Sequence, residues 1–476
     1  MKLRREMAQG FFPPIPSLGN LGAGRLVVVG FVNISYLAIL SALYQGLPSP
    51  TGLLVYVLLS VLTTAIVFAD SLFHPFVLLF ATKTLFILDF LGKDLRGVTL
   101  RWAEVGLPGS NYFRGLGLLL ILVWVVFFFV GYKGSGWCPI LGNTLSGLTP
   151  GRTFRRPWAT SILFLALALV ALFIARDLAG GSFLAMLRRM DDRAEIYAGW
   201  QFLRPLVRFS AIAAILVGWQ GYNKFSYGIL SLGIIGTGLF GGRGAAIFGV
   251  ALPYLIGHHF LIRPIRRRTI FFGGVAAAIA ALAWGQYRDF NTLRLRALTV
   301  KGFIFSLADN TGGADNLPSL LWGIKDGTMN VVWGKHLLNG PIGLIPRKIW
   351  PGKPLITGGA IVGRALMGSD SFAIPVGPWG WVYLNLWWPG VILGGLLTGY
   401  LTGQFYSWVK ADLAAPRSDG VLSVLGYSFL GATMLNIVIP QAQVQLALFS
   451  LLLLILILSD RTVDLILRFA RASPQG

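Results

Sequence analysis

Long apolar stretches separated by short polar ones recur along most of the chain. A helix needs about 20 apolar residues to cross the hydrocarbon core of a bilayer. We expect transmembrane helices at 25–44, 51–70, 72–91, 112–132, 158–175, 201–219, 226–241, 244–260, 269–286, 386–408, 420–438 and 441–459. The pattern therefore predicts an all-α polytopic membrane protein with about 12 transmembrane helices.

Three of these stretches are less regular than the others. The pair 226–241 and 244–260 is short and rich in glycine, so it fits either two spans or one broken or re-entrant pair. The stretch 72–91 carries Lys83 and Asp89. Ionisable residues inside a membrane normally face a cavity or a partner, so this span is the other irregular one.

A long polar gap separates the ninth apolar stretch from the tenth. It divides the chain into 1–286 with nine expected spans, a large loop at 287–378, and 379–476 with three spans and a tail. Connections between packed helices commonly take about 2–8 residues, so this loop is far longer than a connection requires. A segment of that length predicts a functional part of the molecule.

Basic clusters orient the spans, because cytoplasmic loops collect Lys and Arg. We place the densest cluster between spans, RPIRRR at 263–268, in the cytoplasm. Counting from there puts both termini in the cytoplasm and the loop outside. The first apolar run is too long for a signal-peptide core, so it is expected to be the first span.

The charge balance adds a second observation about the loop. The whole chain carries a net charge of +22, and the loop holds 10 Lys and Arg residues against 5 Asp residues. Long loops are translocated regardless of charge, so the insertion rule does not explain this excess. The cations are scattered between spans without a long basic tail, so no nucleic-acid partner is expected. An anionic ligand at the outer face is the better explanation.

Arginines near the outer ends of the central spans are candidate ligands for such an anion. The stretch LFGGRGAAIFG places Arg243 between glycines, where one expected helix ends and the next begins. Helix-start amides favour an anion, and a guanidinium can hold a pyrophosphate through paired hydrogen bonds. Arg204 and Arg208 lie four residues apart on one helical face. All three can instead be interfacial arginines that snorkel to headgroups.

The loop supplies further candidates in the proline-bracketed segment IPRKIWPGKP. Its prolines lower the entropic cost of holding Arg347 and Lys353 in place. Trp350 between them can stack on a sugar or lie at the membrane interface. The same two interpretations apply to the other tryptophans near the loop, Trp333, Trp379 and Trp381. The remaining candidate cations of the loop are Arg288 and Arg364.

Four loop residues, His336, Asp309, Asp315 and Asp326, could each act as a general base, and Asp315 and His336 are the two we select; for each of them a structural or solvated role is the more common one. The chain has no H-E-x-x-H, no phosphate-binding G-x-x-x-x-G-K-[ST] and no G-x-S-x-G. We therefore expect no metal, no cofactor and no nucleotide-driven activity. The other three histidines, His74, His258 and His259, are expected at the inner face. The single cysteine, Cys138, excludes an intramolecular disulfide.

Three motifs together resemble the O-antigen polymerase family, the Wzy-like oligosaccharide repeat-unit polymerases. TGLFGGRGAAI is similar to the glycine-arginine-glycine turn between two central helices of that family, and IPRKIWPGKP to a segment of its external loop. VGPWGWVYLNLWWPGVILGGLLTG resembles the stretch that leads from the loop into the next helix. Arg347 and Gly358 also match the family's R-x10-G spacing, which the Arg243 turn lacks. Trp379, Gly380 and Trp381 stand where an acidic residue is usual.

The resemblance implies a multi-span glycosyltransferase similar to the GT-C class, at the outer face of the bacterial inner membrane. It would polymerise undecaprenyl-diphosphate-linked oligosaccharide repeat units of a surface polysaccharide, with a chain-length regulator as a further partner. Arg243 and one or more of Arg204, Arg208, Arg288 and Arg347 would bind the diphosphate, with Arg243, Arg288 and Arg347 as the catalytic candidates. Arg204, Arg208, Lys353, Trp350 and Arg364 would bind the substrate.

Two other functions stay open from the sequence. An O-antigen ligase, which transfers the glycan to a lipid core, has a similar span count and an expected loop histidine, here His336. A transporter or flippase of an anionic lipid or solute would suit broken helices and the intramembrane charges Lys83 and Asp89. Against the transporter, the chain shows no repeated halves.

Overall fold

The computed structural model describes the chain in ten main stretches. They are residues 23–67, 73–95, 110–136, 157–188, 203–241, 246–266, 316–337, 358–368, 376–415 and 418–434, with the isolated positions 69, 71, 196–197, 269, 273, 342, 345, 349–350, 352, 374, 443, 446–447 and 450. Every regular element that spans several residues in these stretches is a helix. The expected spans 269–286 and 441–459 lie outside them, apart from single positions.

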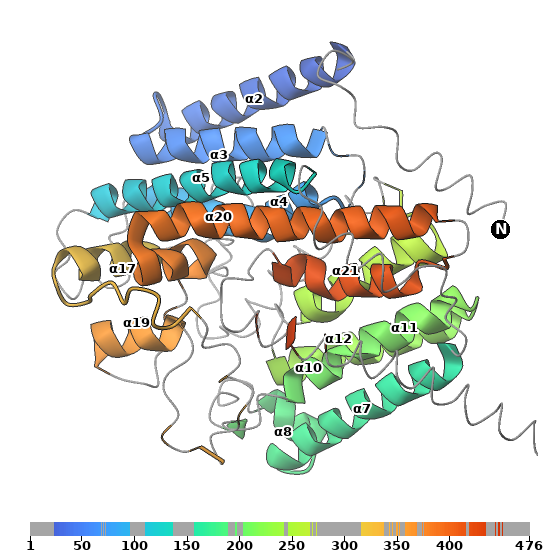
Figure 1. Ribbon diagram of the computed structural model, residues 1–476. Coiled ribbons are helices and arrows are strands. Elements are labelled where there is room, and N and C mark those ends of the chain that lie inside the picture. Colours follow the sequence, from blue (N-terminus) through green and yellow to red (C-terminus); the bar gives the residue numbers. More distant parts are fainter. Residues whose placement is uncertain are drawn as a thin grey trace, which may run out of the picture.

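The helices of the first half are α2 (Ala23–Tyr44), α3 (Pro50–Val67), α4 (Pro75–Leu95), α5 (Ser110–Gly134), α7 (Pro157–Leu178), α8 (Phe183–Arg188), α10 (Leu203–Arg208), α11 (Ser210–Trp219) and α12 (Asn223–Gly241). The later ones are η3 (Ile247–Ala251), α14 (Leu252–Gly257), η4 (His258–Ile262), α17 (Asn316–Lys325), α19 (Gly358–Met367), α20 (Gly377–Ala414) and α21 (Val421–Met434). Figure 1 shows them as a bundle in which the long helices run side by side.

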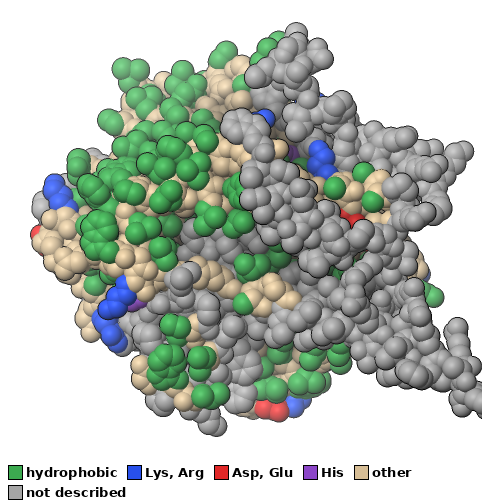
Figure 2. Space-filling view, in the orientation of Figure 1, with side chains coloured by type: hydrophobic (Ala, Val, Ile, Leu, Met, Phe, Trp, Pro, Cys, Tyr) green, Lys and Arg blue, Asp and Glu red, His purple; other side chains and the backbone are tan. Residues whose placement is uncertain are grey.

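Four of these helices are long and apolar enough to cross a membrane. They are Arg25–Tyr44, Pro50–Val67, Tyr112–Gly134 and Pro157–Leu178. Figure 2 shows hydrophobic side chains gathered over the part of the surface that α2, α3 and α5 form. Phe31 and Ile34 of α2 are among the most exposed, as expected for lipid contact. The protein is therefore a helical protein whose apolar helices suit a membrane, and the total of twelve spans stays a prediction.

Two expected spans have different bounds or continuity in the structure. The span 201–219 is divided into α10 and α11, because the chain tightens at Phe209, whose N–H donates to the Leu206 carbonyl at 3.1 Å. The tenth span begins earlier than 386, at Gly377. Its first two residues therefore belong to the range that the sequence assigned to the loop. That loop also contains α17 and α19, two helices too short for the span criterion to find.

The glycines 395, 399 and 403 form the small-residue packing face that their four-residue spacing predicts. They lie against α5. A Cβ added at Gly395 would stand 2.7 Å from the Trp124 carbonyl oxygen, and one at Gly399 would collide with the Phe128 carbonyl oxygen. The two helices run in the same direction, so their first residues lie at the same end of the bundle. α20 is consequently held along most of α5.

One end of the bundle is marked by His74. The Tyr132 hydroxyl near the end of α5 lies 2.9 Å from His74 Nε2, and the His259 ring packs edge-on at 5.0 Å against Phe73. The Tyr427 hydroxyl donates to the Phe73 carbonyl at 2.6 Å. The late residues of α5 and of the segment 247–262 therefore meet here. This placement agrees with the expectation that His74 and His259 share a face.

The loop helices lie at the opposite end. Gly117, near the start of α5, faces Leu317 of α17, whose Cδ2 would lie 3.4 Å from a Cβ at that glycine. In Figure 1 the segments α17 and α19 occupy the left-hand end, where α20 begins. The segment 247–262 has η4, with His259, at the His74 end, so its first turn in η3 lies away from that end. The end that holds α17 and α19 is the end opposite His74. We call it the loop end.

Candidate functional site

Arg208 lies in a corner between three helical segments toward the loop end. It is the last residue of α10, and its side chain runs across Gly249 of η3. A Cβ at Gly249 would stand 2.6 Å from Arg208 Nε and 3.1 Å from Cζ. The arginine therefore fills space that only a glycine leaves open. η3 is a π-helix, a departure from regular geometry that is frequent at functional sites.

The end of α12 also lies at this corner. A Cβ at Gly238 would lie 3.9 Å from that of Ala246, so α12 packs beside the start of the next segment. The connection at 242–245 includes Arg243, which lies outside the described residues. Ala246 is only three residues before Gly249, so the Arg208 side chain lies about one helical turn from where this connection ends. Arg204 belongs to α10, but its side chain is outside the described set.

His336 reaches the bundle because α20 breaks. Trp387 has φ 56° and ψ −144°, and Pro389 follows. A regular helix would bond the Asn385 carbonyl to the N–H of residue 389, which proline lacks. That carbonyl instead accepts the Gly334 N–H at 2.7 Å, and the Leu384 carbonyl accepts the Val332 N–H at 2.9 Å.

The side chain of Asn385 completes this attachment. It is fully buried, and its Oδ1 accepts the His336 N–H at 3.2 Å while its Nδ2 donates to the Trp381 carbonyl at 2.9 Å. The imidazole lies 6.4 Å from the Trp381 ring. Sequence reasoning missed Asn385. The signal was its position four residues before a proline inside an apolar helix.

The environment of His336 keeps its imidazole neutral. Burial lowers the pKa of this side chain below its ordinary value, and the positive charge of Lys335 lowers it further. The ring is therefore deprotonated at neutral pH and has a nitrogen lone pair that can accept a proton. Asp315, the other candidate base, lies outside the described residues.

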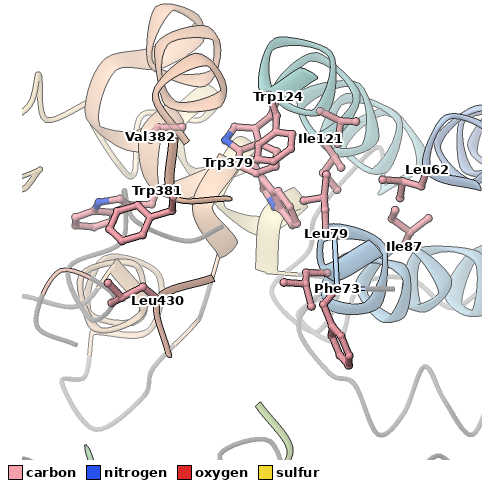
Figure 3. Packing of buried hydrophobic residues seen from close by; sticks show 14 of the residues in the cluster. Leu62, Phe73, Leu79, Ile87, Ile121, Trp124, Trp379, Trp381, Val382 and Leu430 are labelled. Carbon is pink, nitrogen blue, oxygen red and sulfur yellow. The ribbon is translucent and has the colours of Figure 1, made fainter. Parts of the chain in front are cut away.

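Trp379 and Trp381 are packing residues, which corrects both interpretations from the sequence. Each is only 1% exposed, so neither can stack on a sugar or anchor at the membrane interface. Figure 3 shows Trp379 beneath Trp124, at a ring separation of 6.0 Å, with Trp381 extending away from them. Lys83 of α4 is buried in the same region, with Nζ 5.0 Å from the Trp379 ring. A cation–π contact therefore accounts for the buried position of Lys83.

The remaining candidates are spread over the loop. Arg364 is exposed on α19, which packs on α17 through the approach of Leu366 to Gly323. Trp350 is also exposed. Arg288, Arg347 and Lys353 lie outside the described residues. Arg208 and His336 are thus the two candidates whose surroundings the structure defines in detail.

A polar cluster that the sequence did not indicate joins α2, α3 and α4. The Asp94 carboxylate accepts hydrogen bonds from the Tyr44 hydroxyl and, at 2.6 Å, from the Ser49 hydroxyl. Ser49 Oγ in turn accepts the Gly52 N–H at 3.0 Å, capping α3. These contacts tie three helix ends together, and we interpret the cluster as structural. Within the described residues, no group of three His, Cys, Asp or Glu side chains is placed to hold a metal.

No family model, no curated protein and no solved structure matches this chain. The resemblance to O-antigen polymerases accordingly stays a prediction from the motifs.

Proposed function

We propose that the chain is a membrane glycosyltransferase. It polymerises undecaprenyl-diphosphate-linked oligosaccharide repeat units of O-antigen or a related surface polysaccharide at the outer face of the bacterial inner membrane. One observation carries the proposal: the break in α20 holds the backbone of His336, a loop histidine whose imidazole is neutral, at the loop end, and Arg208 lies in a corner away from the His74 end. The cation-rich loop and the three family-like motifs agree with it.

The reaction needs three events to balance. The acceptor hydroxyl oxygen bonds to the anomeric carbon of the donor glycan, and the bond from that carbon to the diphosphate oxygen breaks. The departing lipid diphosphate keeps the electron pair, and the hydroxyl proton passes to a base. No nucleotide enters, because the donor already carries an activated leaving group.

The cations of the site bind the diphosphate leaving group. Arg208 and Arg243 bind the diphosphate and stabilise the charge that grows on it as the glycosidic bond breaks. Arg204, Arg288, Arg347, Lys353 and Arg364 are further cations for the same substrate, with Trp350 for its sugar. His336 accepts the proton of the acceptor hydroxyl, and Asp315 is the alternative base.

The test is turnover by the purified full chain. A short undecaprenyl-diphosphate repeat unit is added without nucleotide, and the products are separated on a gel. A ladder of lengthening glycan supports the proposal. Arg208→Ala and Arg243→Ala should each slow the ladder by about 10²–10³, the usual cost of losing one group that stabilises transition-state charge. Arg176→Ala is the control, since Arg176 pairs at 2.7 Å with the exposed carboxylate of Asp177.

The alternative that a specific observation favours is an O-antigen ligase, since it too would use a loop histidine such as His336. The same assay separates the two, because a ligase would extend a lipid-core acceptor once and form no ladder. Movement of the intact lipid-linked glycan across a vesicle membrane, with neither a ladder nor an extended lipid core, would support the transporter instead.

A further inference from the structure

An exposed aromatic surface lies beside His336 at the loop end. Trp333 is 73% exposed and Trp387 is 47% exposed. The N–H groups of Val332 and Gly334 donate to the carbonyls of Leu384 and Asn385 in α20. These bonds hold Trp333 beside the turn of α20 that precedes Trp387. Tyr112 at the start of α5 is 60% exposed at the same end, and the Trp387 indole N–H donates to the Tyr383 hydroxyl at 2.8 Å. We call Trp333, Trp387 and Tyr112 the aromatic patch.

Both tryptophans have a strained backbone. Trp333 has φ 45° and Trp387 has φ 56°, in the left-handed region that bulky residues rarely adopt. Glycine would adopt these angles without strain. Tryptophans that merely anchor a protein at the membrane interface need no such backbone. Strained residues cluster at ligand-binding sites, where the surrounding structure holds a side chain in one orientation.

The charges around the aromatic patch select an anionic ligand. Within the described stretch 316–337 the residues with full charges are Lys325, Asp326 and Lys335, all exposed. Lys325 Nζ lies 4.9 Å from the Tyr112 ring. The Asp326 carboxylate accepts the Thr328 hydroxyl at 3.0 Å. This stretch therefore carries two cations and one anion near the aromatic rings. Figure 2 shows Lys and Arg side chains at this end of the molecule.

We propose that the aromatic patch is a stacking subsite for an anionic sugar ring, with Lys325 and Lys335 pairing with the sugar's carboxylate. The apolar C–H face of a pyranose matches an exposed indole face, Lys325 lies against the Tyr112 ring, and the exposed Lys335 follows Trp333 by two residues. His336 follows Trp333 by three residues, so the subsite belongs to the glycan whose hydroxyl gives up its proton. Only that assignment to the acceptor rests on the proposed function.

Binding is measured first, without turnover. The full chain in nanodiscs of zwitterionic lipid is titrated with a glucuronate-containing disaccharide and with its neutral glucose counterpart, followed by saturation-transfer NMR. Wild type should prefer the acidic disaccharide. Trp333→Gly and Trp387→Gly should each weaken its binding by about tenfold, because each loses one stacking ring. Lys325→Gln and Lys335→Gln should remove the preference for the acidic sugar.

The glycine variants also separate binding from folding. Glycine relaxes the left-handed backbone, so the melting temperature should stay level or rise while sugar binding falls. A merely structural role would lower both. The controls are Trp158→Ala, which removes a tryptophan that is 46% exposed on α7, and Lys224→Gln, which removes an exposed lysine at the start of α12.

Two results would overturn the subsite. One is sugar binding that is equal in wild type and in the glycine variants. The other comes from a repeat in nanodiscs containing phosphatidylglycerol: sugar binding that falls in the glycine variants only with this lipid would make the patch a lipid anchor. A wild type that binds the sugar at the patch but forms no ladder from an authentic repeat unit would sink the polymerase and keep the subsite. A ladder that is unaffected in both glycine variants, with unchanged sugar binding, would reject the subsite and keep the polymerase.

Discussion

At the scale of single residues, the chemistry concentrates on a few side chains whose neighbours set their properties. His336 is the clearest case, because burial and Lys335 both favour its neutral form. Arg208 is a second, since the missing side chain of Gly249 leaves room for its guanidinium. In both cases a neighbouring residue sets the charge state or the position of the residue that is proposed to act.

The neutral state of His336 predicts a pH dependence. Its pKa is lowered, so the imidazole loses its lone pair only when the pH falls below the ordinary histidine range. Polymerisation should be level near pH 7 and should decline on acidification. Lys335→Gln removes one cause of the lowered pKa, so the acid limb of the kcat profile should move to higher pH. His336→Gln should abolish the limb, and a limb that survives in this variant would assign the base elsewhere.

At the scale of elements, a missing donor in one helix organises the loop. Pro389 leaves the Asn385 carbonyl without a helical partner, and the loop backbone takes it. The same logic applies to α5 and α20, where missing side chains on glycines allow the backbones to meet. The loop therefore joins α20 through the missing N–H of a proline, and α5 joins α20 through the missing side chains of glycines.

Restoring the donor should release the loop. In Pro389→Ala, the new N–H competes for the Asn385 carbonyl, and α20 gains helical hydrogen bonding that proline denies it, a penalty of about 3 kcal/mol in helix interiors. We expect faster hydrogen exchange at 332–337 and loss of polymerisation, with thermal stability level or higher. Pro378→Ala is the control, because proline in the first helical turn costs little. Unchanged exchange at 332–337 would contradict this account.

The contact between α5 and α20 can be tested with two glycines of one helix. A Cβ at Gly131 would collide with the Leu396 carbonyl of α20, whereas one at Gly115 meets nothing within 4 Å. Gly131→Ala should therefore destabilise the protein and lower its yield. Gly115→Ala should be neutral or stabilise it by up to about 1 kcal/mol through helix propensity. Equal melting temperatures for the two variants would refute close backbone packing here.

The Asp94 cluster predicts a third effect between elements. Asp94→Ala removes a charged acceptor shared by the Tyr44 and Ser49 hydroxyls, and hydrogen bonds to charged groups contribute about 1.5–3 kcal/mol. We expect a loss of unfolding free energy of that order. Asp177→Ala, which breaks an exposed ion pair on α7, should cost less than about 1 kcal/mol. Similar losses in both variants would remove the special role of the cluster.

At the scale of the whole molecule, the helical class and the main apolar helices were predictable from the sequence, because a stretch of about 20 apolar residues is typical of a membrane-spanning helix. It missed α17 and α19, since helices of 10 residues carry no span signal. It left Trp379 and Trp381 undecided because tryptophan suits both interface and core, and only the packing against Trp124 decides between them. Asn385 could have been identified by noting that Pro389 leaves the carbonyl four residues earlier without its helical donor.

The arrangement of the two ends makes a prediction about the membrane. The structure places Asp326 and His74 at opposite ends of the bundle, and the charge pattern predicts that the loop end faces outward. In a Cys138→Ser background, Asp326→Cys should react with a membrane-impermeant maleimide in intact spheroplasts. Lys224→Cys, at the start of α12, should react only after the membrane is opened. The opposite labelling would invert the topology and move the loop, with its cations and His336, to the cytoplasm, where the proposed polymerisation could not occur.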